Sequence, residues 1–230
     1  MRTIYSYIVY IILLLQLNSC NNEGLMYEYE HSTPIKFSSS CINVSTKSQG
    51  IIENNKLPKG SNISIFSIQH PENTTINLWE PILFDNIKGI SNFNGDIEYN
   101  NTYYFPDKEQ LDFFAIYPFL SFPTIGSDYG NTQYTPVTLK DNTVDQYDLM
   151  YASLLNQSKK SSVLVFEFHH LLTQITINII KNTGVTIDLP LTKVQIVAPQ
   201  SATLDIWHGQ LSDIAGQTTY TLDTNTTLSN

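Results

Sequence analysis

Two adjacent histidines, His169 and His170, are the first candidates for a metal site, because imidazole nitrogens are common metal ligands. They follow an alternating apolar stretch, which predicts a strand, and neighbouring side chains on a strand point to opposite faces. The two rings therefore cannot bind one metal ion together without a bulge. We expect one histidine to point inward and form a hydrogen bond with the backbone, and we expect no metal ion.

Acidic residues suggest two further kinds of site, a calcium loop and a catalytic carboxylate pair. Asp141, Asp145 and Asp148 cluster in one loop, and Ca²⁺ prefers oxygen ligands. They lack the alternating spacing and central glycine of a calcium loop, so the sequence favours a solvated acidic turn. Asp112 and Glu167 would suit a glycoside hydrolase only at a defined separation, which a sequence does not give.

Motifs of common enzyme classes are absent from the sequence: it contains no G-x-S-x-G elbow, P-loop, G-x-G-x-x-G, H-E-x-x-H or C-x-x-C. We therefore expect no catalytic residues, no cofactor and no enzymatic activity. The formal net charge of the 230 residues is −9, and Arg2 is the only arginine. A nucleic-acid-binding protein needs a basic stripe, so this class is excluded.

Eight aromatic residues lie within twenty positions, and flat rings suit the faces of sugars. The same rings would also fill the core between adjacent strands, and we favour that role. The residues are Tyr103, Tyr104, Phe105, Phe113, Phe114, Tyr117, Phe119 and Phe122.

Cys20 is the candidate for covalent lipid attachment. Arg2 precedes an apolar run, Ile4 to Leu17, which spans about 21 Å as a helix and is too short for a bilayer core of about 30 Å. The run has the form of a signal peptide, and its end, Leu17-Asn18-Ser19-Cys20, resembles the lipobox of bacterial lipoproteins. We expect residues 1–19 to be removed, Cys20 to carry acyl chains such as palmitate, and residues 20–34 to form a tether. The alternative is an ordinary cleaved signal.

With Cys20 acylated, Cys41 has no partner for an intramolecular disulfide. Its neighbours, Ser38-Ser39-Ser40-Cys41-Ile42, match no signature of a cysteine enzyme. We expect a buried or half-buried thiol.

The body of the chain predicts strands separated by turn-forming residues. A nearly continuous apolar run at Leu111 to Pro118 is typical of a strand covered on both faces. Leu149 to Leu155 is the best candidate for a single helical turn, and Asp205 to Gln210 suggests a strand that runs into a turn. The last ten residues show no convincing core strand. The other predicted strands are Asn62 to Ile68, Val163 to Phe168, Ile175 to Ile180, Val194 to Val197 and Thr218 to Leu222.

Strands at this spacing, without helices between them, predict an all-β antiparallel sandwich. The order of five segments resembles the fimbrillin family, which comprises lipoprotein pilins and anchor or accessory proteins of type V pili. The segments are Leu17 to Cys20; Ile35 to Phe37 with Ser45 to Lys47; Leu57 to Phe66; Tyr103 to Pro106 with Leu111 to Pro118; and Asp148 to Ala152 with Phe166 to Leu172.

This resemblance implies a transthyretin-like antiparallel β-sandwich of Greek-key type over residues 35–212, with residues 213–230 as a tail or the truncated start of a second domain. It also implies a cell-surface or fimbrial location, a lipid anchor in the outer membrane, and a role in adhesion. Other fimbrial subunits are the implied partners, joined by donor-strand exchange after a protease removes the first strand.

Members of the family are usually cut after an arginine near the position of Lys47, but no arginine follows Arg2. Either a lysine-tolerant protease cuts at Lys36, Lys47 or Lys56 and opens the groove, or the first strand and lipid stay in place. The resemblance thus predicts a fimbrial subunit or a membrane-retained anchor. The alternative function is a glycan-binding lipoprotein that uses the exposed rings of Tyr103 and Tyr104.

Overall fold

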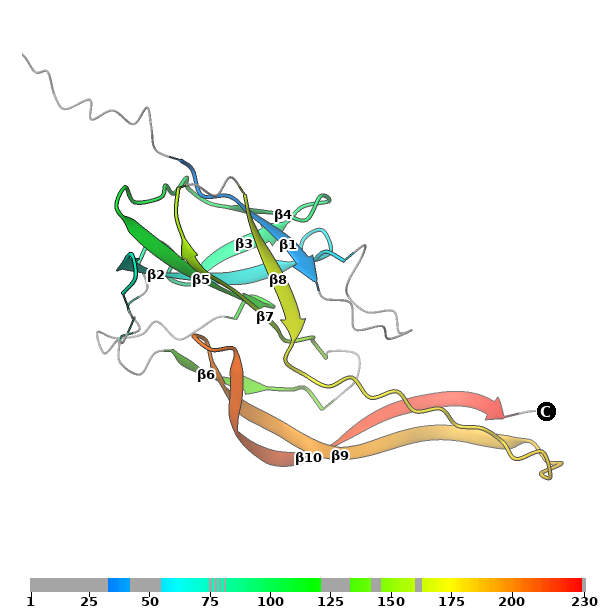
Figure 1. Ribbon diagram of the computed structural model, residues 1–230. Coiled ribbons are helices and arrows are strands. Elements are labelled where there is room, and N and C mark those ends of the chain that lie inside the picture. Colours follow the sequence, from blue (N-terminus) through cyan, green and yellow to red (C-terminus); the bar gives the residue numbers. More distant parts are fainter. Residues whose placement is uncertain are drawn as a thin grey trace, which may run out of the picture. The chain divides into compact units, whose positions relative to one another are not determined.

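The protein is all-β, as predicted. The computed structural model describes residues 33–41, 55–74, 76, 78, 80, 82–120, 133–141, 146–159 and 163–228, which all belong to one compact unit, Thr33–Asn230. Within these ranges there are ten strands and no helix (Figure 1). No described helix is long and apolar enough to cross a membrane.

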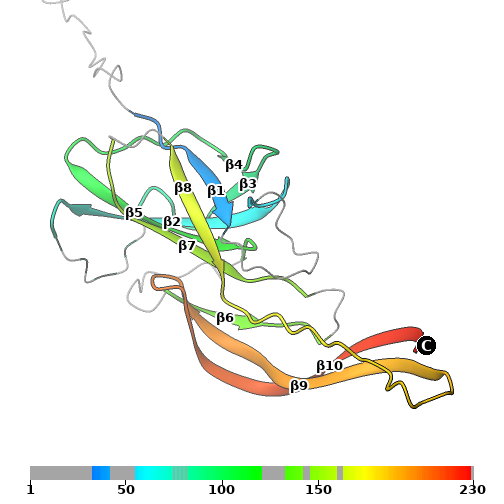
Figure 2. The same cartoon turned by 45° about the vertical axis from the view of Figure 1, so that its right-hand side comes forward.

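Seven strands form a closed barrel in the order β1-β4-β3-β2-β5-β7-β8 (Figures 1 and 2). Their bounds are β1 Phe37–Cys41, β2 Asn62–Pro71, β3 Ile87–Ser91, β4 Asp96–Tyr99, β5 Glu109–Tyr117, β7 Met150–Gln157 and β8 Leu164–His170. All pairs in the barrel are antiparallel except β1 with β8, which run parallel. The predicted antiparallel arrangement is therefore wrong for this pair, because a strand from the start of the chain completes the barrel beside β8.

A second sheet contains three antiparallel strands in the order β10-β9-β6. β6 spans Tyr134–Thr138, and β9 (Leu189–Asp205) and β10 (Gln210–Leu228) form one long hairpin. The strand ending at Asp205 and the turn after it confirm the prediction for this stretch. The strand predicted at Thr218 to Leu222 is confirmed within β10, which continues to Leu228, and no described side chain of residues 221–228 is buried.

Two apolar cores lie on opposite faces of β5. Leu111, Phe113 and Ala115 belong to the core inside the barrel. Phe114 and Ile116 belong to a second core that also includes Val137 of β6 and Leu204 of β9. β5 is thus covered on both faces, which confirms the prediction made from its continuous apolar run.

The predicted strands at Asn62 to Ile68 and Val163 to Phe168 are confirmed by β2 and β8. The helical turn predicted at Leu149 to Leu155 is wrong, because these residues lie almost entirely in β7. Leu149, Met150, Tyr151 and Ala152 are all buried, so β7 has apolar side chains on both faces and no period of two.

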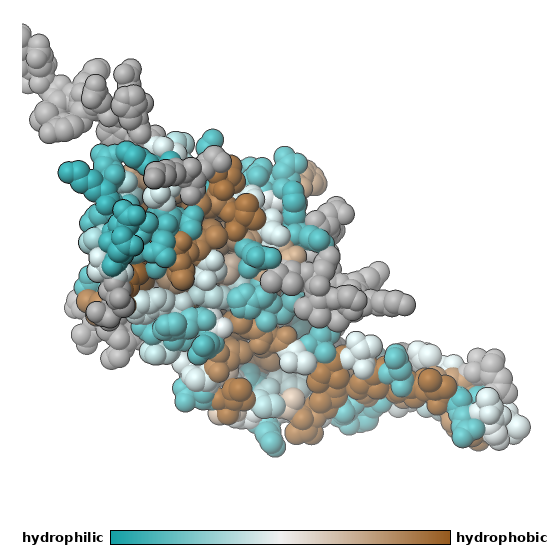
Figure 3. Space-filling model, viewed as in Figure 1, coloured by the Kyte–Doolittle hydropathy of each residue, from teal (hydrophilic) through white to brown (hydrophobic). Residues whose placement is uncertain are grey.

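The strand predicted at Ile175 to Ile180 is also wrong. Residues 173–182 form no strand, and the side chains of Ile175 and Ile180 are 60% and 87% exposed. The segment therefore has the sequence pattern of a strand without a sheet to join. Figure 3 shows apolar surface, in brown, along this segment and the outer part of the β9–β10 hairpin.

Candidate functional site

β1 is the strand that closes the barrel, between β8 and β4 (Figures 1 and 2). It pairs with β8 along its whole length, from Phe37 to Cys41, and with β4 only at Phe37 and Ser38. Its removal would leave β4 and β8 as two unpaired edges, and unpaired edges recruit other strands.

Every second side chain of this segment points into the core. Ile35, Phe37 and Cys41 are 2%, 2% and 3% exposed, and Ser39 between them is also buried. Lys36 is exposed. The pattern Ile-Lys-Phe-Ser-Ser-Ser-Cys has the period of two that would have revealed this strand in the sequence.

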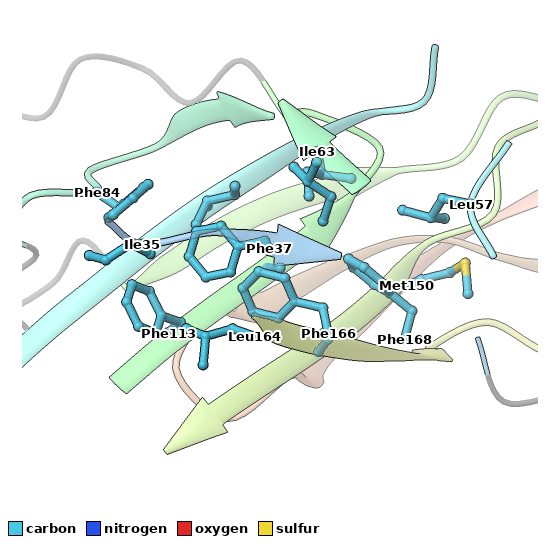
Figure 4. Packing of buried hydrophobic residues seen from close by; sticks show 14 of the residues in the cluster. Ile35, Phe37, Leu57, Ile63, Phe84, Phe113, Met150, Leu164, Phe166 and Phe168 are labelled. Carbon is cyan, nitrogen blue, oxygen red and sulfur yellow. The ribbon is translucent and has the colours of Figure 1, made fainter. Parts of the chain in front are cut away.

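Phe37 lies at the centre of an aromatic cluster contributed by several strands (Figure 4). Its ring centroid is 4.8 Å from that of Phe166 on β8 and 5.0 Å from that of Phe113 on β5. The rings of Phe84 and Tyr99 lie 5.5 and 5.9 Å away. A single side chain of β1 therefore fills a pocket built from the rest of the barrel.

Backbone hydrogen bonds hold both ends of this segment. Ile35 N donates to Tyr103 O at 2.9 Å, and Leu164 N donates to Lys36 O at 2.9 Å. Farther along, Cys41 N donates to Asn55 O at 2.8 Å. The segment is an integral strand of the barrel in this state.

The buried polar side chains of β1 are neutral, and the hydroxyl group of Ser39 has hydrogen-bond partners. Ser39 Oγ donates to Gly95 O at 3.0 Å and accepts from Leu57 N at 3.3 Å. Burial, and to a smaller extent the charge of Asp148, raises the pKa of the Cys41 thiol to about 11. The thiol is therefore protonated and unreactive while β1 is in place, as expected for a buried cysteine.

The comparison with known families decides the identity of the chain. The model of the family described as fimbrillin-like matches residues 47–230. The chain belongs to the fimbrillin-like family. The matched stretch begins after β1, so the strand that closes the barrel precedes it. No curated protein matches the sequence.

Solved structures share the fold of this fimbrillin-like chain. A protein from Bacteroides uniformis ATCC 8492, whose name links it to cell adhesion, is 22% identical with a TM-score of 0.56, covering 85% of this chain and 71% of that one. A fimbrial protein from Bacteroides vulgatus ATCC 8482 is 16% identical with a TM-score of 0.54, covering 85% of this chain and 74% of that one. At these identities the likeness establishes the fold.

Of the proposed processing sites in this family member, Lys36 and Lys56 are described, and both are exposed. The Nζ of Lys56 donates to Asn94 O at 2.7 Å. Lys47 lies outside the described residues, as does Cys20, the proposed lipidation site. Because Lys36 precedes β1, a cut after it would leave β1 attached, whereas a cut after Lys47 or Lys56 would separate β1 from the barrel.

The two histidines have different neighbours in the structure. His169 is exposed, with its ring in an edge contact with Tyr151, and His170 Nδ1 lies 2.6 Å from Asp148 Oδ2. We predicted that the inward histidine forms a hydrogen bond with the backbone. This prediction is wrong, because the ring of His170 lies next to the carboxylate of Asp148 instead. No group of three potential ligands that could hold a metal ion occurs among the described residues.

The other acidic candidate residues do not come together in one site among the described residues. Asp141 is exposed, and Asp145 lies outside the described residues. Asp148 Oδ2 lies 2.6 Å from His170 Nδ1, so Asp148 is no part of a solvated turn. Asp112 is buried beside His70, whereas Glu167 is exposed on β8, so the two do not form a catalytic pair.

The aromatic-rich stretch contributes mainly to the two cores, as favoured from the sequence. Phe105, Phe113 and Phe114 are buried, and Tyr103 packs against the barrel core with its ring 4.5 Å from that of Phe84. Tyr104 is 37% exposed. Phe122 lies outside the described residues. Tyr103 and Tyr104 thus differ in environment and do not form a shared exposed platform.

Proposed function

We propose that this protein is a structural component of the cell surface, a fimbrial subunit or a membrane-retained anchor or accessory protein, that assembles by strand exchange and takes part in adhesion. One observation carries the proposal: β1 closes the barrel with alternating buried side chains and lies before the family-matched stretch. The names of the fimbrial and adhesion-linked structures with the same fold agree with it.

Loss of β1 would create a groove with two kinds of binding group. The edges of β4 and β8 would offer backbone donors and acceptors, which give affinity. The cavities left by Ile35 and Phe37 would accept alternate apolar side chains of an incoming strand, which fix its register. A strand from a neighbouring subunit supplies both.

The position of β1 restricts the processing step. A cut after Lys47 or Lys56 releases β1 together with the lipid on Cys20, whereas a cut after Lys36 releases the lipid and retains β1. Lys36 is also less suitable because its carbonyl accepts a hydrogen bond from β8. We therefore favour Lys47 or Lys56 for a polymerising subunit and no cut for an anchor.

The domain organisation follows the same proposal. Residues 1–19 are the signal peptide, residues 20–34 the tether and residues 35–212 a transthyretin-like sandwich of Greek-key type. The core shared by β5, β6 and β9 supports a two-layer arrangement. Residues 213–230 are a tail or the start of a second domain. The apolar residues Ile214 and Leu222, 64% and 49% exposed, are surface that such a domain would cover.

Intact mass and N-terminal peptide mapping of the protein purified from its own cell surface test this proposal. An acylated Cys20 on an uncut chain supports the anchor, and an N-terminus after Lys47 or Lys56 supports the polymerising subunit. A chain that has lost its signal without acylation and still contains β1 contradicts both forms of the proposal.

A further inference from the structure

An open cleft of about 550 Å³ lies outside the barrel and away from the β1 groove. Its lining includes Asp112 and Phe114 of β5, Tyr151 and Ser153 of β7, and the turn between β9 and β10. Along β5, Leu111 and Phe113 point into the barrel, so Asp112 and Phe114 are on its outer face. The cleft is therefore independent of strand exchange.

One wall of the cleft is a rigid pair of rings. Trp207 and His208 stack with their ring centroids 5.4 Å apart and an interplanar angle of 18°. Asp205 contacts the backbone of Trp207 and the ring of His208: its Oδ1 accepts from Trp207 N at 2.9 Å, and its Oδ2 lies 2.7 Å from His208 Nδ1. The side chain of His208 remains 55% exposed.

The turn that carries these rings is fastened to β7. Tyr151 donates from its hydroxyl group to Trp207 O at 2.6 Å. Gly209, at φ +63°, packs so closely on the Tyr151 ring that an added Cβ would lie 2.3 Å from its Cδ1 atom. The ring wall is thus held in place before any ligand arrives, which lowers the entropy cost of binding.

Other residues of the lining form its polar side and offer hydrogen-bonding groups. Asp112 Oδ1 accepts from Asn156 N at 2.6 Å and lies 3.2 Å from His70 Nε2. No described residue forms a hydrogen bond with Asp112 Oδ2. Ser153 and Gln210 add neutral polar side chains to the lining.

We propose that this cleft binds a saccharide unit of a neutral glycan. A sugar ring presents an apolar C–H face and a rim of hydroxyl groups, which match the ring wall and the polar side respectively. The volume is within the range of about 300–1,000 Å³ typical of small-ligand sites. Asp112 Oδ1 already accepts a hydrogen bond from Asn156 N, and the carboxylate can accept further hydrogen bonds from sugar hydroxyls.

The test is binding of the intact mature protein to an array of neutral oligosaccharides, with an acetylated lysine-free peptide and a lysine-rich peptide as non-sugar probes. We expect binding to at least one oligosaccharide, weakened at least tenfold by His208→Ala and by Gln210→Ala. Both residues are exposed, so thermal unfolding should change little. Tyr104→Ala, which removes the exposed ring of the alternative platform, should leave binding unchanged.

Two results would overturn the proposal: no binding to any oligosaccharide, whether or not the lysine-rich peptide binds, or binding lost in Tyr104→Ala but kept in His208→Ala. Each would leave the strand-exchange proposal intact, because the maturation of β1 is measured separately by mass.

Discussion

The ring of Phe37 stacks on the ring of Phe166, with centroids 4.8 Å apart and an interplanar angle of 25°. The contact joins β1 to β8, the only parallel pair among the described strands of the barrel. Parallel strands need a long connection, and here most of the chain separates the two. The contact that closes the barrel is therefore the one that loss of the N-terminal segment would break.

Phe37→Ala should lower the free energy of unfolding by about 3–5 kcal/mol, because it leaves a cavity among the surrounding rings. Chemical denaturation of the uncut protein measures the effect. The matched control is Val165→Ala on the outer face of β8, where the side chain is 47% exposed and the cost should be about 0.5 kcal/mol or less. Equal costs for the two variants would contradict the central position of Phe37.

The stability of the protein should fall in alkaline solution, in part because of Cys41. Its pKa is raised from 9.0 to about 11, so the folded state favours the neutral thiol. This stabilisation is fully present below pH 9 and is lost as the pH rises from 9 towards 11, where the unfolded chain ionises first.

Denaturation of the native protein and Cys41→Ala at pH 8 and pH 10 measures this contribution. The native protein should lose on the order of 1 kcal/mol more than the variant between the two pH values. Other groups that ionise in this range, such as tyrosines, are present in both proteins and cancel. An identical loss in both would show that the thiol is not stabilised in its neutral form.

Gly209→Ala should destabilise the protein more than Gly216→Ala does. Both glycines have positive φ, +63° and +65°, so each substitution costs about 1–2 kcal/mol in backbone strain. At Gly209 the new Cβ would also collide with the Tyr151 ring, at a further cost of about 1–3 kcal/mol, whereas at Gly216 the nearest atom is 3.6 Å away. Thermal and chemical denaturation of the two variants compare them directly, and equal costs would disprove the close packing of Gly209 on Tyr151.

Sequence patterns were most informative for strands that have one buried face and one exposed face. In β8, Leu164, Phe166 and Phe168 are buried while Val165 and Glu167 are exposed, and this alternation is plain in the sequence. The alternation of Ile175, Ile177 and Ile179 is equally plain, yet they are exposed and outside any strand. A pattern shows which face a strand would bury, but not whether a partner strand is present.

The candidate sites show the same limit. The burial of the Cys41 thiol was predictable from the surrounding sequence and from the lack of a disulfide partner. Its place on the strand that closes the barrel was not, because it depends on pairing with β8, which is distant in the sequence. The cleft was not predictable, because Asp112 and His208 come from different sheets. Sequence distance hides such neighbours, and no local motif marks them.

The most direct test of strand exchange places one arginine on either side of β1. In a chain that begins at Asn21, Cys41 is the only cysteine and no arginine is present. Lys47→Arg creates a site for an arginine-specific protease after β1, and Lys36→Arg creates the matched control site before it.

Maleimide labelling of Cys41 and size-exclusion chromatography are measured for each variant before and after protease treatment. We predict that cutting Lys47→Arg exposes Cys41 to labelling and yields assemblies larger than the monomer, while protease-treated Lys36→Arg stays monomeric with Cys41 protected. A fully cut Lys47→Arg protein that stays monomeric and keeps Cys41 protected would contradict the proposal that β1 occupies an exchangeable groove.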